Sequence, residues 1–171
     1  MKFILTGLLF VSLASVAKEK KHREHAAHSH GHAELSIAFD SLLGQVEFKS
    51  PAESIVGFEH KATSEKDLQK LATARMDFET NISKYIQFDS TLGCTFEKKS
   101  IEMVTGAGDD LHADFVARFD VTCAKPLNGS TIVFDFTSVK KLKDVDATIL
   151  AGELQLKTEI RKKKTTLEIK N

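Results

Sequence analysis

Five of the seven histidines in this 171-residue chain stand close together near the N-terminus. They are His22, His25, His28, His30 and His32. In an extended chain, residues two apart share a face about 6 to 7 Å apart, so neighbouring imidazoles can close on one ion. Neutral imidazole is a common ligand for Zn²⁺, and also for Cu²⁺ and Ni²⁺. The cluster predicts metal binding, with a solvated polar tail as the alternative.

The two other histidines, His60 and His112, stand apart in the sequence. His112 with Asp114 repeats the two-apart pattern, and a carboxylate oxygen is an acceptable zinc ligand. Both histidines lie where we expect secondary-structure elements to end, as His30 and His32 do. We therefore expect His60 and His112 to share one zinc ion, with His32 or His30 as third ligand and Asp114 as fourth. Asp109 and Asp110 are interpreted as turn residues, with hydrogen bonding to a ligand histidine as the alternative.

Signals for catalysis are weak. The sequence contains no HExxH, GxSxG or glycine-rich phosphate loop. Glu59 beside His60 is the one hint of a zinc-dependent hydrolase, which would need a general base and an open coordination position for water. We expect a protein that is not an enzyme, and keep a secreted zinc hydrolase and a metal-buffering envelope protein as alternatives.

The first seventeen residues are interpreted as a secretory signal peptide. Lys2 precedes an apolar stretch from Phe3 to Leu13 that is too short to span a bilayer. Ser15-Val16-Ala17 offers small residues for cleavage after Ala17, and an uncleaved anchor is the alternative. No other stretch is apolar enough to cross a membrane. We expect an exported protein without membrane insertion after cleavage.

Export decides how the two cysteines are interpreted. An oxidising compartment favours a disulfide between Cys94 and Cys123, and a two-thiolate metal site is the weaker alternative because no CxxC spacing is present. Both cysteines fall on the inward faces of expected strands, which antiparallel pairing would bring within bonding range. The chain carries 24 basic and 24 acidic residues, and this balance argues against a nucleic-acid partner.

Residues 18–31 are charged, rich in histidine and without large apolar side chains, so we expect a flexible metal-binding tail. Residues 32–171 are expected to form a single zinc-binding domain. Period-two alternation at 33–39 and 45–49 predicts a β-hairpin that Pro51 stops. Ser64 with Asp67 resembles a capping box and predicts a helix at about 64–80, with a less regular turn to Ile86. Its expected apolar stripe is Leu68, Leu71, Ala72, Met76 and Ile82.

The second half of the domain is predicted to consist mainly of strands. We predict strands at 94–104 and 115–123, joined by a glycine-rich turn at 106–110, and three closing strands within 145–149, 154–160 and 167–169. Lys162 to Lys164 is expected to form a hairpin tip, while 133–141 fits either a helix or a strand. The fold class is α+β, mostly an antiparallel β-sheet or sandwich with one main helix.

Several segments together resemble one known family. The segments HSHGHAELSIAFD, SPAESIVGFEH and HADFVARFDVTCAKPL, the pair Gly93-Cys94 and the apolar closing strands resemble the ZrgA-type periplasmic zinc-uptake accessory proteins, in order from about His22 to beyond Leu150. The resemblance implies a secreted, non-enzymatic, Zn²⁺-binding protein that assists an inner-membrane ABC zinc importer. It implies the tail histidines, His60, His112 and Asp114 as metal-binding candidates. The tail is shorter than family members often carry, and residues 128–139 fit the pattern loosely.

Overall fold

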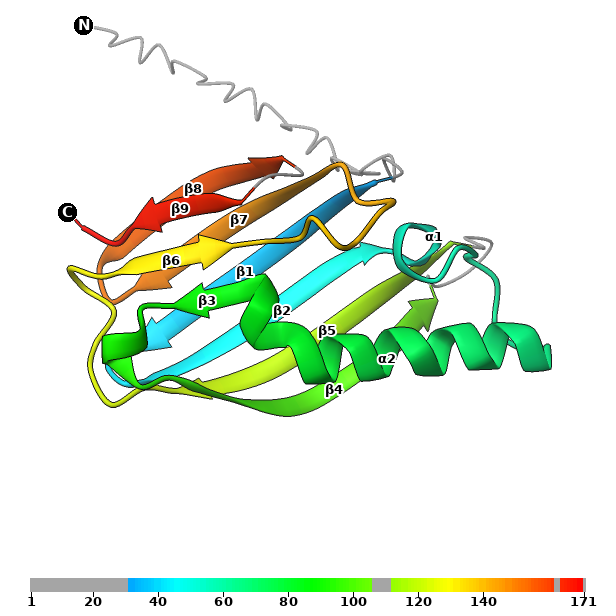
Figure 1. The fold of residues 1–171 in the computed structure, drawn as a ribbon, viewed down its shortest axis with the longest axis horizontal. Coiled ribbons are helices and arrows are strands. Elements are labelled where there is room, and N and C mark those ends of the chain that lie inside the picture. Colours follow the sequence, from blue (N-terminus) through cyan, green and yellow to red (C-terminus); the bar gives the residue numbers. More distant parts are fainter. Residues whose placement is uncertain (1–30, 106–111, 162–163, 171) are drawn as a thin grey trace, which may run out of the picture.

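The computed structural model describes residues 31–105, 112–161 and 164–170, and they form two sheets and one long helix (Figure 1). The larger sheet has six strands in the order β4-β5-β2-β1-β7-β8. Their bounds are β4 (Thr95–Thr105), β5 (Ala113–Thr122), β2 (Leu43–Pro51), β1 (His32–Asp40), β7 (Asp144–Ala151) and β8 (Leu154–Arg161). The smaller sheet, in the order β3-β6-β9, contains β3 (Ile86–Phe88), β6 (Thr131–Phe134) and β9 (Thr165–Glu168). The helical segments are α1 (Ala52–Ile55), α2 (Glu65–Tyr85) and the 3-10 turn η1 (Ser90–Leu92).

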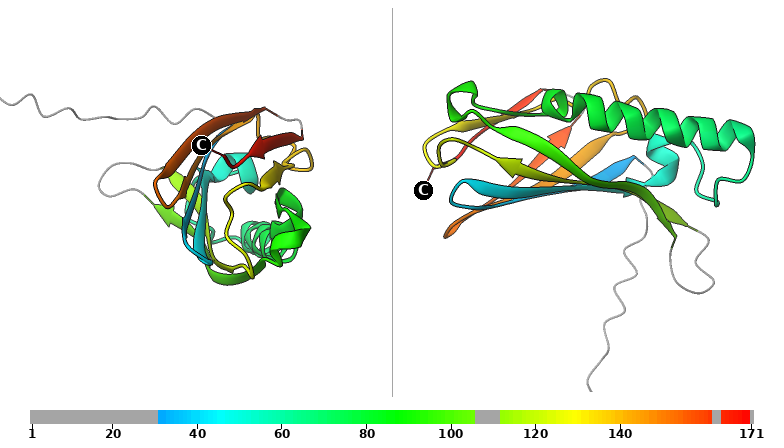
Figure 2. Two further views of the ribbon diagram at one scale, coloured as in Figure 1. Left: turned by 90° about the vertical axis from the view of Figure 1, so that its left-hand side faces the viewer. Right: turned by 90° about the horizontal axis from the view of Figure 1, so that it is seen from below.

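Helix α2 and the smaller sheet cover one face of the six-stranded sheet, and the core lies between these two layers (Figure 2). Strand β1 illustrates how the sheet obtains one buried face. Every second residue, Ala33, Leu35, Ile37 and Phe39, points inward and is buried, while the residues between them face solvent. The predicted α+β class, with a mostly antiparallel sheet and one main helix, is confirmed. The pairing of β1 with β7 is parallel, which the sequence did not predict.

The predicted hairpin is present as β1 and β2, which are longer than expected and pair antiparallel. Ser41 in the turn adopts a positive φ of 55°. Gly44 lies directly beneath the Phe39 ring, because a Cβ at this position would stand 2.5 Å from ring atoms. The close approach of backbone and ring explains the glycine after the turn.

Helix α2 begins as predicted and extends further. The Ser64 hydroxyl accepts a hydrogen bond from Asp67 N at 3.1 Å, which is the expected N-cap. The helix continues without a break to Tyr85 rather than ending near residue 80. Its predicted apolar stripe is wrong in part, because Leu68 and Met76 are 52% and 67% exposed. At 3.6 residues per turn, Met76 points about 140° away from Leu71, whereas Phe78 and Ile82 stay within roughly 20° of it.

Aromatic side chains join α2 to the sheet beneath it. The ring centroid of Phe78 lies 4.9 Å from that of Phe48 and 5.0 Å from that of Phe115. Tyr85 stacks on Phe136 at 5.5 Å and donates its hydroxyl hydrogen bond to Asp77. Burial and the Asp77 carboxylate raise the pKa of Tyr85 to about 12. The hydroxyl therefore stays protonated and keeps its donor role across the physiological range.

The C-terminal part differs from the prediction in its pairing. Residues 133–141, which fitted either element, begin as β6 and continue as turns. The three closing strands are present as β7, β8 and β9, but the hairpin expected at 162–164 is wrong, because β8 pairs with β7 and β9 pairs with β6 in the other sheet. The expected turn at 106–110 lies outside the described residues.

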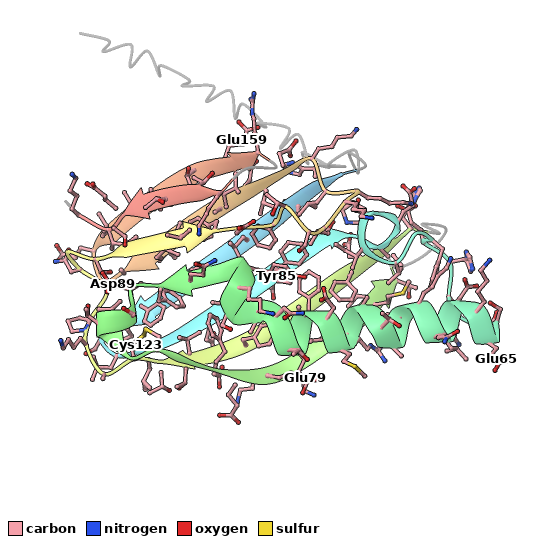
Figure 3. All side chains as sticks on the ribbon, in the orientation of Figure 1. Glu65, Glu79, Tyr85, Asp89, Cys123 and Glu159 are labelled. Atoms are coloured by element: carbon pink, nitrogen blue, oxygen red, sulfur yellow. A yellow bond between two sulfur atoms is a disulfide. The ribbon has the colours of Figure 1, made fainter. Side chains whose placement is uncertain are left out.

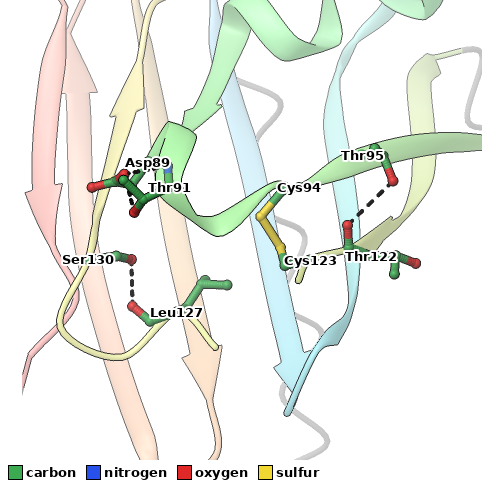
Figure 4. The surroundings of a disulfide bond; sticks show 8 residues. All are labelled: Asp89, Thr91, Cys94, Thr95, Thr122, Cys123, Leu127 and Ser130. Atoms are coloured by element: carbon green, nitrogen blue, oxygen red, sulfur yellow. Dashed lines mark hydrogen bonds between the residues drawn. A yellow bond between two sulfur atoms is a disulfide. The ribbon is translucent and has the colours of Figure 1, made fainter. Parts of the chain in front are cut away.

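One end of the larger sheet, which we call the disulfide end, is joined by the bond between Cys94 and Cys123 (Figure 4). The predicted pairing of the cysteines is confirmed. Backbone bonds reinforce this end: Cys123 N donates to Leu42 O at 2.9 Å, and Ala124 N donates to Leu92 O at 2.8 Å. On the chain-entropy estimate, a bridge closing about 30 residues stabilises the fold by about 3.5 kcal/mol.

Candidate metal-binding site

The opposite end of the six-stranded sheet, which we call the histidine end, is where β1, β5 and β7 begin. Strand β1 runs parallel to β7, and it is antiparallel to β2, which in turn is antiparallel to β5. The three strands therefore start at the same edge. Within the described residues the histidines are His32, His60 and His112, and the ring of each lies against a carboxylate.

His32 is positioned by the junction between the N-terminal segment and β1. Gly31 N donates to the buried hydroxyl of Ser54 in α1 at 2.9 Å, and Gly31 O accepts from Lys143 N at 2.6 Å. Gly31 has a φ of +87°, and a Cβ there would lie 2.8 Å from Cγ of Lys143. This close approach between the two chain segments requires a glycine.

Two carboxylates of β7 flank the His32 ring. The parallel register places His32 opposite Asp144, whose Oδ1 accepts a hydrogen bond from Nδ1 of the ring. Two residues further on, Asp146 presents Oδ2 at 3.6 Å from His32 Nε2. In the strand register, Asp146 lies opposite Glu34 of β1 and Glu159 of β8. These three carboxylates help to line a surface hollow of about 430 Å³. The surroundings of His32 are thus rich in oxygen donors of the kind that zinc accepts.

His60 lies in the connection between α1 and α2. Its Nε2 donates to Asp67 Oδ2 at 3.2 Å, and its ring packs on Phe58 with centroids 4.9 Å apart. The Ser64 hydroxyl also donates to Asp67 Oδ2, at 2.7 Å. These two donors hold the pKa of Asp67 below its ordinary value, with the Ser64 bond as the larger cause. Asp67 therefore caps the helix and orients His60 at the same time.

His112 lies immediately before β5, and its Nδ1 donates to Oε2 of Glu59. The Glu59 side chain is 14% exposed, whereas that of His112 is 52% exposed. Since Glu59 and His60 are consecutive in the chain, the contact brings His112 beside the loop that carries His60. Asp114 of β5 forms an ion pair with Lys49 of the neighbouring strand β2, and Asp114 Oδ2 lies 3.2 Å from Lys49 Nζ.

The predicted ligands of one shared ion lie in separate contacts. His60 pairs with Asp67, His112 with Glu59, and His32 with the two aspartates of β7. Strands β1 and β5 are separated by β2, so His32 and Asp114 stand about two strand spacings, or roughly 10 Å, apart. No group of three or more histidine, cysteine, aspartate or glutamate side chains within the described ranges is arranged to hold a metal ion. The shared site stays a prediction, and His22, His25, His28 and His30 lie outside the described residues.

The sequence reasoning missed the aspartates of β7 as partners of a histidine. Asp144 and Asp146 alternate on the outward face of β7, and this D-x-D spacing was visible in the sequence. The parallel pairing that brings them to His32 was not visible. Asp67 was noticed as a cap and Glu59 as a hydrolase hint, but neither was assigned to a histidine it contacts.

The sequence matches the family described as ZrgA family zinc uptake protein over residues 27–169. The chain belongs to this family. The match covers both ends of the six-stranded sheet, including the three described histidines and their carboxylate partners. A search of curated proteins found no match. In the part of the chain that the structure describes, none of the helices has the length and apolar character needed to cross a bilayer.

Proposed function

We propose that this member of the zinc uptake family is a periplasmic protein that captures Zn²⁺ and assists its delivery to an ABC-type importer, without enzymatic activity of its own. The histidine-rich segment at 18–31 makes the first, weaker contacts with zinc. The histidine end of the folded domain then holds the ion more tightly. The segment joins the domain at Gly31 and His32, so the path between the two is short.

The observation that carries this proposal is the pairing of each described histidine with a carboxylate at one end of the sheet. In zinc sites, ligand histidines commonly donate one ring N–H to a carboxylate, which fixes the tautomer and raises the basicity of the other nitrogen. The bond from His60 Nε2 to Asp67 leaves Nδ1 as the nitrogen for zinc, and the bond from His112 Nδ1 to Glu59 assigns that role to Nε2. His32, flanked by Asp144 and Asp146, offers nitrogen and oxygen donors together.

We propose His60 and His112 as ligands in the folded domain, with His32 or His30 as a third and Asp114 as an oxygen ligand. The adjacency of Glu59 and His60 supports the first two, because the contact of His112 with Glu59 brings its ring beside the loop that carries His60. Bringing Asp114 to the ion requires Lys49 to release it. This ion pair is half-buried, with the Asp114 side chain only 18% exposed, so Asp114 would exchange one charged partner for another at the ion.

The experiment is a calorimetric zinc titration of the processed chain, beginning at Lys18, compared with His112→Ala and His60→Ala. We expect either substitution to abolish the tightest binding event while weaker events at the N-terminal segment persist. Deleting residues 18–29 should lower zinc stoichiometry and leave the melting temperature of the zinc-free domain unchanged, because this segment has no large apolar side chain to contribute to a core.

Two results would count against the proposal. If both histidine variants keep the tightest affinity, the N-terminal segment alone binds the metal. If the processed chain shows no sub-micromolar zinc binding, capture of zinc is not its role.

A further inference from the structure

A groove of about 770 Å³ runs along α2, and none of the described histidines lines it. Residues of α2 at helical spacing form one wall, and residues 54–57 and 138–141 form the other. Figure 1 shows α2 on one side, with α1 and the connection from β6 to β7 across from it. From Lys66 to Phe78 the α2 wall extends over about 18 Å, which is the length of five or six extended residues.

The floor of the groove is apolar, and its rim is basic. Ile55, Val56, Ala74, Phe78 and Val139 line the floor. Lys66 and Lys70 stand one helical turn apart on α2, and Lys140 and Lys141 stand on the facing connection. The ring of Tyr85 and its hydrogen bond to Asp77 close the polar end of the groove. Tyr85 is labelled near the middle of Figure 3.

The four lysines are available to a ligand. Lys141 Nζ lies 3.3 Å from Glu53 Oε1 at an exposed position, whereas Lys70 Nζ lies 3.9 Å from Oδ1 of Asp67, whose side chain is 16% exposed. An exposed pair such as Lys141 with Glu53 is weak and can be exchanged for a ligand contact. Lys66 and Lys140 form no ion pair with other described residues. Asp77 is the one acidic side chain among the residues that line the groove.

We propose that this groove binds an extended acidic peptide segment of a partner protein, with apolar side chains on the floor and carboxylates between the two lysine pairs. Charge complementarity selects the occupant. The chain's own segment at 18–31 has more basic than acidic residues and would be repelled. The proposal does not depend on zinc binding, because none of the described histidines lines the groove, although Lys70 at its rim also contacts Asp67.

The test uses fluorescence anisotropy of the processed chain with three labelled, capped hexapeptides. One alternates glutamate with leucine, one glutamate with serine, and one lysine with leucine. We expect the first to bind at least about tenfold more tightly than the others, because burial of its leucine side chains adds favourable transfer free energy and like charge repels the third. Salt should weaken the binding.

Matched variants locate the site. Lys66→Gln combined with Lys140→Gln should weaken binding by roughly threefold or more, since each exposed charge contact makes a small favourable contribution. Lys125→Gln combined with Lys157→Gln removes the same charge from exposed positions outside the groove and should leave binding unchanged. Equal affinities for the glutamate-leucine and glutamate-serine peptides, or equal losses in both double variants, would overturn the proposal. So would binding to anionic phospholipid vesicles in preference to the peptide, which would identify the groove as a membrane contact.

Discussion

The two ends of the six-stranded sheet differ in the kind of contact that holds them. At the disulfide end, a covalent bond between Cys94 and Cys123 and backbone hydrogen bonds tie β4, β5 and the first hairpin together. At the histidine end, the characteristic contacts join titratable side chains, such as His112 with Glu59 and Lys49 with Asp114. A disulfide keeps its strength as pH changes over the physiological range, whereas a histidine contact changes with protonation and with any metal that competes for the ring.

The difference teaches how a domain with the proposed zinc ligands would keep its stability while those ligands change partners. The residues proposed for zinc are exposed or half-buried and contribute little to the core, so their contacts can be exchanged without unfolding the sheet. Stability is supplied elsewhere, by the disulfide and by the aromatic core beneath α2. Variants at the two ends should therefore separate stability from zinc affinity.

The largest expected effect is at the disulfide end. Replacing both Cys94 and Cys123 by alanine should lower the free energy of unfolding by about 3.5 kcal/mol, because the unfolded chain regains the entropy of an open loop. Urea titration measures the change, and calorimetry at a temperature where the variant is folded should give wild-type zinc affinity. Loss of the tightest zinc-binding event in this variant would show that zinc affinity also depends on the disulfide end.

At the histidine end, Glu59→Gln should weaken the tightest zinc event by about 10- to 100-fold, which is the usual effect of removing a carboxylate that orients a ligand histidine. The matched control is Glu79→Gln, which removes an exposed glutamate of α2 that pairs with Lys98 of β4. Competition with a chromogenic chelator measures both affinities. Equal affinities in the two variants would show that Glu59 does not act through His112.

A smaller effect is expected at the junction with β1. In Gly31→Ala, the left-handed backbone alone should destabilise the domain by about 1 to 2 kcal/mol. The total loss should be larger, because the new Cβ meets Lys143. Gly129→Ala is the control at the other end, since Gly129 has a similar φ of +79° and no atom within 4 Å of the Cβ position. Thermal unfolding of both variants isolates the cost of the Lys143 contact. Equal losses would mean that the junction adjusts freely.

The smallest effect concerns pH. The pKa of Asp67 is lowered in the folded domain, so its contribution to stability is present above the ordinary aspartate pKa and is lost as pH falls through the lowered value. Asp67→Asn should therefore melt below wild type at pH 6, and the difference should shrink steadily as pH falls below the ordinary aspartate pKa of about 4. Asp89→Asn is a useful comparison near the disulfide end, where Thr91 lowers the pKa of Asp89. A difference for Asp67→Asn that does not change with pH would exclude the carboxylate charge as its source.

The sequence predicted those features that depend on local pattern. Period-two alternation located β1 and β5, and the cysteine positions on inward faces predicted the disulfide. It could not predict the parallel pairing of β1 with β7, because more than 100 residues separate these strands and no local signal specifies the partner. The contact between His32 and Asp144 depends on that pairing. The helix stripe failed for another reason: Leu68 and Met76 are apolar yet exposed, and composition alone does not tell which apolar residues face the core.

The parallel pairing also has a consequence for the order of folding. Strand β1 can form its hairpin with β2 at once, but its other edge stays unpaired until residues 144–151 are available. Contacts between such distant segments form slowly, because a long loop must close before they contribute. Until then, β1 presents an unpaired strand edge with alternating apolar residues, which is the kind of surface that associates with other chains. The late pairing of β1 with β7 thus removes an aggregation-prone edge and also brings Asp144 to the His32 ring.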